Sequence, residues 1–309
     1  MSQIIICIPT YNRPIQIRSL LDNLNDQTDT DFSTVILNDG ANPETTTVLE
    51  TFKSAFQLHH FESEKPSGLP RARNKILDFI KEHRLSGDAT FVAFLDDDLV
   101  IDDKFISNIR NNTGKYDGFC FRIIQRGAST TYDITGSKFL QTVLTPLIGR
   151  ILPWIGMFFG GFYIKQKEAR MVDHMNGGCL IYNFSKNPDE RFDLNLNEGN
   201  FVAEDTCFSY GLKKKGNRLA FIGSYSYIHN PPNTGGCKIE DRKESFYWYW
   251  KHKLYIFVKY HGKLGFVTCA GASFVESLAL SVLFRTNLVG KYVRAVKTHA
   301  KALNHNVGS

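Results

Sequence analysis

Three adjacent carboxylates are the residues of this chain whose chemistry is easiest to interpret. Asp96, Asp97 and Asp98 come directly after residues 89–95, which have the composition of a buried strand. Neighbouring carboxylates repel one another unless a cation offsets their charge. Oxygen ligands select a hard metal such as Mg²⁺ or Mn²⁺, and such a metal can bridge the two phosphates of a nucleotide. The alternative interpretation is a solvated acidic turn.

Two segments nearer the N-terminus carry polar groups that suit a nucleotide. Asp39 follows an apolar stretch at residues 34–37 and can accept hydrogen bonds from a ribose or a base, although Asp-Gly is also a common turn. Arg71 and Arg73 fall in the first turns of a predicted helix, where cations oppose the helix dipole. We expect them to anchor a phosphate or to pair with the acidic cluster. The alternative is two surface arginines.

Two segments in the second half of the chain could complete such a site. Glu204 and Asp205 begin a predicted helix, where the dipole alone favours acidic residues. A carboxylate there also suits a general base that deprotonates an acceptor hydroxyl. His229 follows a predicted strand at residues 219–227 and can serve as a further metal ligand, because imidazole binds Mn²⁺ acceptably. The alternative for His229 is a structural or exposed histidine.

These residues need a scaffold that brings strand ends together, and the first 125 residues predict one. We expect Asn12 to cap the first helix, which has Pro14 in its first turn. The alternation of apolar runs and helical patterns predicts a mostly parallel, doubly wound α/β sheet, whose ligands bind at the carboxyl ends of the strands. The expected strands are residues 3–8, 34–37, 58–61, 89–95, 119–124, 179–182 and 219–227, and the later helices are residues 69–82, 204–215 and a tail from residue 245.

Composition and charge limit the class of protein. The 309 residues are 42% hydrophobic and 22% charged, which is ordinary for a globular protein. Six cysteines without ligand spacing predict no zinc site and a reducing compartment. The N-terminus lacks a signal-peptide pattern, so we expect a cytoplasmic protein. Residues 238–309 hold 12 Lys and Arg against 4 Asp and Glu, which predicts an anionic partner surface.

Taken in order, the segments above resemble the motifs of the inverting glycosyltransferase family 2, which has the GT-A fold. The resemblance covers residues 3–230. Asn38 departs from the pattern, which usually has Asp there, and no Gln-x-x-Arg-Trp segment of the processive synthases is found. The matching segments are Pro9 to Asn12, Asn38 to Gly40, Gly68 to Asn74, Asp96 to Asp98, Asn176 to Gly178, and the pair Glu204 and Asp205.

The resemblance implies transfer of a single hexosyl or deoxyhexosyl group, with inversion, from a nucleotide diphosphate sugar of the UDP or dTDP type. The implied acceptor is a hydroxyl of a glycan or a lipid-linked molecule in surface polysaccharide biosynthesis, and the implied cofactor is Mn²⁺ or Mg²⁺. By position, the catalytic base is Asp205, and Asp98 and His229 bind the metal. The nucleotide-sugar site comprises Pro9, Tyr11, Asp39, Arg73, Asp96 and Asp97, and the acceptor site comprises Gly177, Gly178 and Glu204.

The chain is expected to divide into a catalytic domain at residues 1–235 and a basic, aromatic, helical region at residues 236–309. The nucleotide-binding half of the domain would be residues 1–125 and the acceptor-binding half residues 126–235. Residues 264–284 are long enough to cross a bilayer, but Glu276 makes crossing costly. We expect this helix to pack on the enzyme or to lie on the inner face of a membrane. An amphipathic helical subdomain is the alternative.

Residues outside that helix are expected to share the membrane surface. Anionic headgroups would contact lysines interleaved with aromatic side chains, and the apolar residues 139–164 would lie beside them. The interleaved residues are Lys251, Lys253, Lys259 and Lys263 with Trp248, Trp250 and Tyr255.

Three other functions compete with sugar transfer as interpretations of these residues. Asp96 to Val100 fits the nucleophile motif of haloacid dehalogenase phosphatases, but the later acidic pair of that fold is missing. A sugar-phosphate nucleotidyltransferase would need a glycine-rich phosphate loop, and residues 10–13 contain no glycine. A non-catalytic glycan- or lipid-binding protein on the same fold is the main alternative. Nucleic acid is not an expected partner, because no recognition motif accompanies the basic tail.

Overall fold

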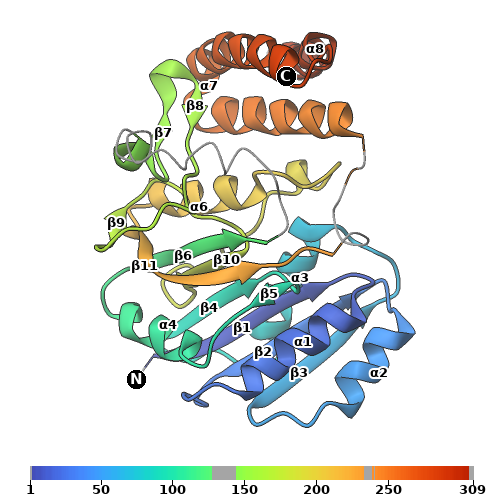
Figure 1. Ribbon diagram of the computed structural model, residues 1–309, viewed down its shortest axis with the longest axis vertical. Coiled ribbons are helices and arrows are strands. Elements are labelled where there is room, and N and C mark those ends of the chain that lie inside the picture. The colour runs from blue at the N-terminus through green and yellow to red at the C-terminus, as the bar shows by residue number, and fades with distance from the viewer. Residues whose placement is uncertain (1, 127–143, 233–238, 240, 306–309) are drawn as a thin grey trace.

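The computed structural model describes residues 2–126, 144–232, 239 and 241–305 (Figure 1). Strands and helices alternate first: β1 (Gln3–Thr10), α1 (Pro14–Asn25), β2 (Ser33–Asp39), α2 (Pro43–Thr51), β3 (Gln57–Ser63), α3 (Leu69–Glu82) and β4 (Thr90–Leu95). Shorter elements follow: β5 (Leu99–Val100), α4 (Phe105–Thr113), β6 (Gly118–Gln125), η2 (Thr145–Leu147), β7 (Ile151–Leu152), η3 (Pro153–Ile155), β8 (Met157–Phe158) and β9 (Arg170–Met171). The last are β10 (Cys179–Asn183), η4 (Leu194–Leu196), α6 (Glu204–Lys214), β11 (Leu219–His229), α7 (Arg242–Leu283) and α8 (Val289–His305).

A single large sheet organises the first 230 residues. Its strand order is β3-β2-β1-β4-β10-β6-β11-β5, and β9 pairs with β11. Strands β1 to β4 are mutually parallel, and β6 is parallel to β11. Strand β10 runs antiparallel to both of its neighbours, β4 and β6. The expected mostly parallel α/β sheet is therefore confirmed, as are the expected strands and the helix at Leu69–Glu82.

Both faces of the sheet are buried, which explains the continuous apolar runs of its strands. Alternate residues of β1 point to opposite faces, so Ile4, Ile6 and Ile8 join one core cluster while Ile5 and Cys7 join the other. The first cluster includes residues of α1, α2 and α4, and the second includes residues of α3 and α6. Figure 1 shows α1 and α2 in front of the sheet, with α3 behind it. The strand ends are thus held in fixed positions.

Asn42 and Asn12 precede helices α2 and α1, and only Asn42 caps its helix. Asn42 caps α2 as its type predicts, because its side chain accepts a hydrogen bond from the Thr45 amide at 2.9 Å. The expectation that Asn12 caps α1 is wrong. Asn12 has a φ of 54°, and the capping position belongs to Arg13, whose side chain makes no capping hydrogen bond. The Arg13 guanidinium reaches the acidic cluster instead.

The C-terminal tail is helical, as expected, and folds back on itself. Helix α7 is interrupted at Gly262, whose φ of 60° and ψ of −147° are not helical. Contacts of Glu276 with Trp250 and Lys253 show that the two halves of α7 run side by side in opposite directions, and α8 packs against them. Figure 1 shows this helical layer at the end of the molecule that lies farthest from α2. The expected boundary at residues 235 and 236 lies outside the described residues.

Part of the expected membrane-facing set in this tail is wrong. Trp250 is fully buried, and Lys253 is 1% exposed and pairs with Glu276 at 2.9 Å. Lys259 forms an ion pair with Asp193 at 2.7 Å. The pair of Lys253 with Glu276 joins the two halves of α7, because a buried charge requires a partner, and the pair of Lys259 with Asp193 joins the tail to the sheet-containing part of the chain. Residues 139–143 of the expected apolar surface lie outside the described residues.

Candidate active site

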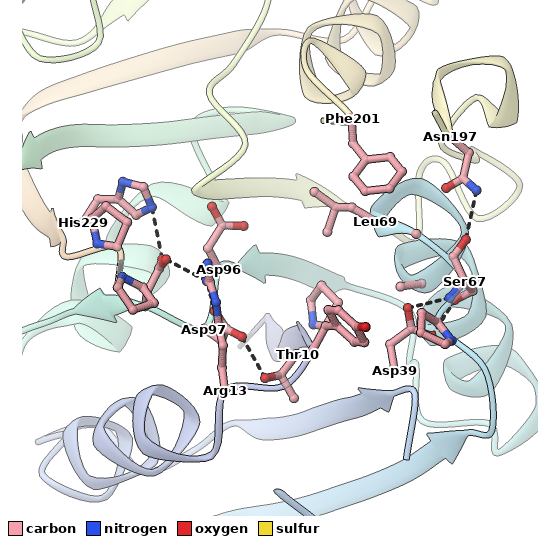
Figure 2. A pocket seen from close by; sticks show the side chains of 18 residues that line it. Thr10, Arg13, Asp39, Ser67, Leu69, Asp96, Asp97, Asn197, Phe201 and His229 are labelled. Atoms are coloured by element: carbon pink, nitrogen blue, oxygen red, sulfur yellow. Dashed lines mark hydrogen bonds and ion pairs between the residues drawn. The ribbon is translucent and has the colours of Figure 1, made fainter. Parts of the chain in front are cut away.

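A cavity of about 630 Å³ opens at the carboxyl ends of β1, β2 and β4 and beside the end of β11 (Figure 2). Seven of the predicted site residues line it: Pro9, Tyr11, Asp39, Asp96, Asp97, Asp98 and His229. The predicted residues Arg73, Gly177, Gly178, Glu204 and Asp205 are not among its lining residues. They lie behind it, where Arg73 and Gly178 are the neighbours of Asp96. The sheet therefore brings together side chains from both halves of the sequence, as ligand binding at strand ends predicts.

Arg13 holds two of the three aspartates. Its Nη1 donates to Asp97 Oδ1 at 2.7 Å and to Asp98 Oδ2 at 2.8 Å, while Thr10 Oγ1 donates to the second oxygen of Asp97 at 2.7 Å. Burial raises the pKa of Asp97 to about 6 despite these contacts. The protein itself therefore offsets part of the repulsion among the carboxylates.

Arg73 does not line the cavity, but it joins Asp96, which does, to Glu204 at the start of α6. It is 1% exposed, and its guanidinium donates to Glu204 Oε1 at 2.6 Å, to Asp96 Oδ1 at 3.2 Å and to the Gly177 carbonyl oxygen at 3.1 Å. Of the two purposes expected for this arginine, the structure shows pairing with acidic residues. Burial raises the pKa of Glu204 to about 8, although the positive charge of Arg73 opposes that shift.

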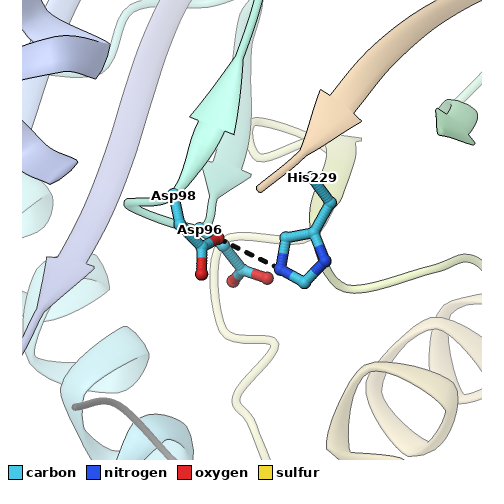
Figure 3. A group of neighbouring side chains, drawn as sticks. All are labelled: Asp96, Asp98 and His229. Carbon is cyan, nitrogen blue, oxygen red and sulfur yellow. Dashed lines mark ion pairs between the residues drawn. The ribbon is translucent and has the colours of Figure 1, made fainter. Parts of the chain in front are cut away.

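Asp96, Asp98 and His229 form a candidate metal site (Figure 3). One ligand atom from each residue lies within 4.8 Å of the other two. His229 Nε2 faces Asp98 Oδ1 at 3.1 Å, and His229 Nδ1 lies 3.0 Å from Gln125 Oε1. Gln125 Oε1 can accept the proton on Nδ1, so Nε2 is the nitrogen directed at the carboxylates, where a metal would take the place of its proton. Two carboxylates and an imidazole are a ligand set that Mn²⁺ accepts, so these residues fit the predicted cofactor.

The charges at this cluster support the same assignment. Burial disfavours the ionised form of Asp98, but the hydrogen bonds and positive charges of His229 and Arg13 outweigh it and hold the pKa of Asp98 below its usual value. Burial raises the pKa of Asp96, and the carboxylate of Asp98 adds to that shift, against the opposing charge of Arg73. Asp98 therefore stays ionised beside Asp96, which resists ionisation. A bound cation would favour the ionised form of both carboxylates.

The other end of the cavity is a slot bordered by an aromatic ring and a buried carboxylate. Both oxygens of Asp39 accept hydrogen bonds from Ser67, one from its amide at 2.8 Å and one from its hydroxyl at 2.6 Å. Gly40, with a φ of +100°, lies against both the Tyr11 ring and Pro66, so a side chain there would meet each at 3.1 to 3.3 Å. Tyr11 is 38% exposed and borders the cavity. An aromatic face beside a buried carboxylate suits a nucleobase and its ribose.

Asn38, the residue that departs from the family pattern, points away from this slot. It is fully buried, and its Nδ2 donates to the Asn42 carbonyl oxygen at 3.0 Å, to Thr46 Oγ1 at 3.1 Å and to Glu62 Oε1 at 3.0 Å. Its Oδ1 accepts from the Asn42 amide at 3.2 Å. The side chain joins β2 to α2 and β3, so the departure leaves the cavity unchanged.

Asn38→Asp is expected to destabilise the fold, because it places a second carboxylate beside Glu62 in a buried position. We expect a loss of about 1–3 kcal/mol in the free energy of unfolding, measured by urea titration. The double variant N38D/E62Q should recover most of that loss, since one carboxylate is then replaced by an amide donor. Equal stability of Asn38→Asp and the parent would contradict the structural role assigned to Asn38.

Gly177 and Gly178 lie between Asp205, the predicted base, and Asp96. A Cβ on Gly177 would be 2.9 Å from Asp205 Cβ and 3.0 Å from Asp205 Oδ2. A Cβ on Gly178 would be 3.0 Å from Tyr227 Oη and 3.5 Å from Asp96 Oδ2. The pair therefore separates Asp205 from Asp96 by the thickness of a bare backbone. This explains small residues here without requiring them to bind an acceptor directly.

Gly177→Ala is expected to displace the Asp205 side chain and so to slow sugar transfer by roughly ten- to a hundredfold, because misplacing a reacting group by about 1 Å has costs of this order. Donor affinity should be unchanged, since Gly177 does not line the cavity. Gly114→Ala is the matched control, because a Cβ on Gly114 would meet no atom within 4 Å. Initial rates and donor titrations would be compared. Normal transfer by Gly177→Ala would remove the argument that this contact positions Asp205.

Several residues at the site were not predicted from the sequence. Asn197 Nδ2 donates to the Ser67 carbonyl oxygen at 2.9 Å, and Phe201 closes the same side of the cavity (Figure 2). Phe201 and Ala203 have φ angles of 54° and 66°, a backbone conformation that is strained for these residue types and that places Glu204 and Asp205 at the start of α6. The only signal in the sequence was the short distance of these residues from the Glu-Asp pair.

The fold and this cavity define an α/β protein of the GT-A type with an acidic, metal-compatible site. The model of Glycosyl transferase family 2 matches residues 5–188. The chain belongs to that family, and the protein is a glycosyltransferase. The resemblance drawn from the motifs is thus confirmed at the level of family and fold.

Solved structures share the fold. S. aureus TarS 1-349 in complex with UDP-GlcNAc has a TM-score of 0.61 and 18% identity, over 98% of this chain and 84% of that one. The mannosyltransferase PcManGT from Pyrobaculum calidifontis, in complex with GDP-Man and Mn²⁺, has a TM-score of 0.55 and 14% identity, over 94% and 85% of the two chains. Identities this low show a common fold and no more. No curated protein matches the chain.

Proposed function

We propose that this glycosyltransferase moves one sugar from a nucleotide diphosphate sugar to a hydroxyl of a glycan or lipid-linked acceptor, with inversion at the anomeric carbon. The observation that carries the proposal is the convergence of Asp96, Asp98 and His229 at one edge of the cavity, with Asp205 behind Gly177. A single carboxylate base and a single leaving-group site suffice for one in-line displacement. The TarS and PcManGT complexes with nucleotide sugars support a donor of this class.

Each residue then has a distinct task. Tyr11 and Asp39 hold the nucleoside at the end of the cavity away from the metal site, and Ser67 fixes the orientation of the Asp39 carboxylate. Asp205 removes the proton of the acceptor hydroxyl as the new glycosidic bond forms and the bond to the nucleoside diphosphate breaks. Arg73 keeps Glu204 and Asp96 in place and does not touch the donor, so it is a positioning residue.

Asp96, Asp98 and His229 would hold Mn²⁺ or Mg²⁺, and Gln125 would keep His229 in the ligating tautomer. When bound, such an ion neutralises charge on the departing diphosphate. Arg13 is placed to balance the same cluster, because it already contacts Asp97 and Asp98.

The test is calorimetric titration with UDP, dTDP and GDP, each with and without Mn²⁺. Micromolar binding that requires the ion would support the donor site and identify the base. Sugar release from the matching donor would then be followed, and NMR of the product would show whether the anomeric configuration is inverted. Binding without any turnover on an acceptor panel or in water would favour the alternative, a binding protein on the same fold.

We also propose that the enzyme works in the cytoplasm, on the surface polysaccharide pathway that the resemblance implies. The five cysteines among the described residues are all free and buried, which suits a reducing compartment: Cys7, Cys120, Cys179, Cys207 and Cys269. Retention of activity and an unchanged melting temperature in millimolar dithiothreitol would be expected. Inactivation by the reductant would contradict this location.

A further inference from the structure

The second half of α7, residues 263–283, presents an unusual outer surface. Between residues 264 and 283 its exposed residues recur at helical spacing and are all apolar or glycine, so they form one continuous stripe. The only charged side chain between residues 264 and 283 is Glu276, and it does not belong to the stripe. The large members, here called the apolar face, are Leu264, Val267, Phe274, Val275, Leu278, Val282 and Leu283, with exposed fractions of 44% to 80%.

The opposite side of the same helix is fastened to the enzyme. Cys269, Ser273 and Ser277 are fully buried. Glu276 turns inward, where it accepts hydrogen bonds from Lys253 at 2.9 Å and Trp250 at 3.3 Å. The helix is long and apolar enough to span a membrane, but the one carboxylate of its second half forms an ion pair with Lys253 on the side that faces the protein. This one-sided arrangement suits a helix that lies on a membrane more than one that crosses it.

A loop from the catalytic domain extends the apolar face. Thr268 Oγ1 donates to the Pro153 carbonyl oxygen at 2.7 Å, which fixes η3 against the helix. Gly156 lies so close that a Cβ there would be 2.3 Å from the Cys269 backbone. Trp154, between these contacts in the sequence, is 71% exposed. Tryptophan prefers the boundary between headgroups and acyl chains, so its place beside the apolar face fits the same surface.

The charges around the apolar face decide which partner fits it. Lys263 and Arg285 are exposed at its two ends. Residues 242–305 contain 11 Lys and Arg but only two acidic residues, and both acids form ion pairs, Glu276 with Lys253 and Glu244 with Lys291. A second copy of the chain would bring like charges together, whereas an anionic bilayer complements apolar contact with opposite charge.

We propose that the apolar face of α7, with Trp154, docks this protein flat on a bilayer that contains anionic phospholipids. The inserted groups are the apolar side chains of residues 264–283, and Lys263 and Arg285 contact the phosphate headgroups. Docking leaves the nucleotide cavity untouched, because none of these residues lines it. The proposal is independent of the donor and of the reaction.

The first experiment measures binding of the full chain to vesicles of phosphatidylcholine with and without phosphatidylglycerol, by cosedimentation. Val275→Asp with Val282→Asp should lower the partition coefficient by about a hundredfold, because each buried valine contributes roughly tenfold. Ile15→Asp is the matched control, since Ile15 is 77% exposed on α1 and should have no effect. Thermal melting checks that all variants fold. Equal losses in variant and control, or no vesicle binding by the parent, would overturn the proposal.

A second experiment uses the three tryptophans, of which Trp154 is exposed and Trp250 is buried. Brominated phospholipids in the same vesicles should quench the emission of the parent, and Trp154→Phe should remove most of that quenching. Lys263→Glu with Arg285→Glu should weaken binding to anionic vesicles by roughly tenfold or more, while the exposed Lys104→Glu should not. Quenching that is unchanged in Trp154→Phe, or a dimer that the Val275→Asp pair dissociates without vesicle binding, would contradict lipid docking.

Discussion

Asp205→Asn is expected to reduce sugar transfer at least about a hundredfold while the donor binds with unchanged affinity. A positioned general base contributes on the order of a hundred- to ten-thousandfold, and the amide cannot accept the proton of the acceptor hydroxyl. The structure indicates that the substitution leaves the donor cavity and the start of α6 unchanged. Asp205 does not line the donor cavity, and its Oδ1 accepts from the Thr206 amide at 2.7 Å, a contact that the asparagine oxygen can keep.

Release of nucleoside diphosphate from the donor, to acceptor or to water, measures this prediction, and calorimetry measures donor affinity in parallel. Asp189→Asn is a useful control because it removes a carboxylate that is 90% exposed and forms an ion pair with Lys81. Near-normal transfer by Asp205→Asn would move the base to another residue. Loss of donor affinity together with transfer would instead show that Asp205 belongs to the donor site.

Asp98→Asn is expected to abolish the metal-dependent part of nucleotide binding. Asp98 is 6% exposed and contacts both His229 and Arg13, so its carboxylate is the anionic centre of the candidate metal site. Removing its charge takes away a ligand and leaves the His229 imidazole without its anionic neighbour. We expect at least a hundredfold loss of Mn²⁺ affinity, more than the ten- to hundredfold typical of losing a partner outside the ligand set.

Titration of UDP with and without Mn²⁺ measures this effect in the parent and the variant. Asp103→Asn removes an exposed carboxylate five residues farther along the chain and should keep the full Mn²⁺ dependence. A parent protein that binds nucleotide equally well with and without the ion would contradict the metal assignment. Unchanged Mn²⁺ dependence in Asp98→Asn would transfer the ligand role to other residues.

The order of strands and helices in the first 125 residues could be predicted because the burial of each strand on both faces produces continuous apolar runs. The same logic located Asp39 and Asp96 at strand ends, and both line the cavity. His229 was correctly placed at the end of β11, and its approach to Asp98 agrees with the predicted shared metal site. Local patterns sufficed here because the carboxyl ends of parallel strands share one edge of the sheet.

Other features depended on packing between distant segments. The sequence showed Arg13 only as a residue near a helix start, yet its guanidinium binds Asp97 and Asp98. Arg73 was expected near the donor site, and the fold buries it between Glu204 and Asp96, which lines the cavity. A long side chain can reach any partner within its radius, and only the three-dimensional arrangement determines which charge lies there.

The tail shows the same division. Its composition determined that residues 264–283 form an apolar helix and that the region is basic, because helical spacing and net charge are properties of the chain itself. Tertiary structure alone decided which side of the helix is outside. Packing turned Glu276 inward to Lys253 and left Val275 and Val282 exposed. The physical reason is that the buried Lys253 requires a partner for its charge, and Glu276 meets it only when this side of the helix faces inward.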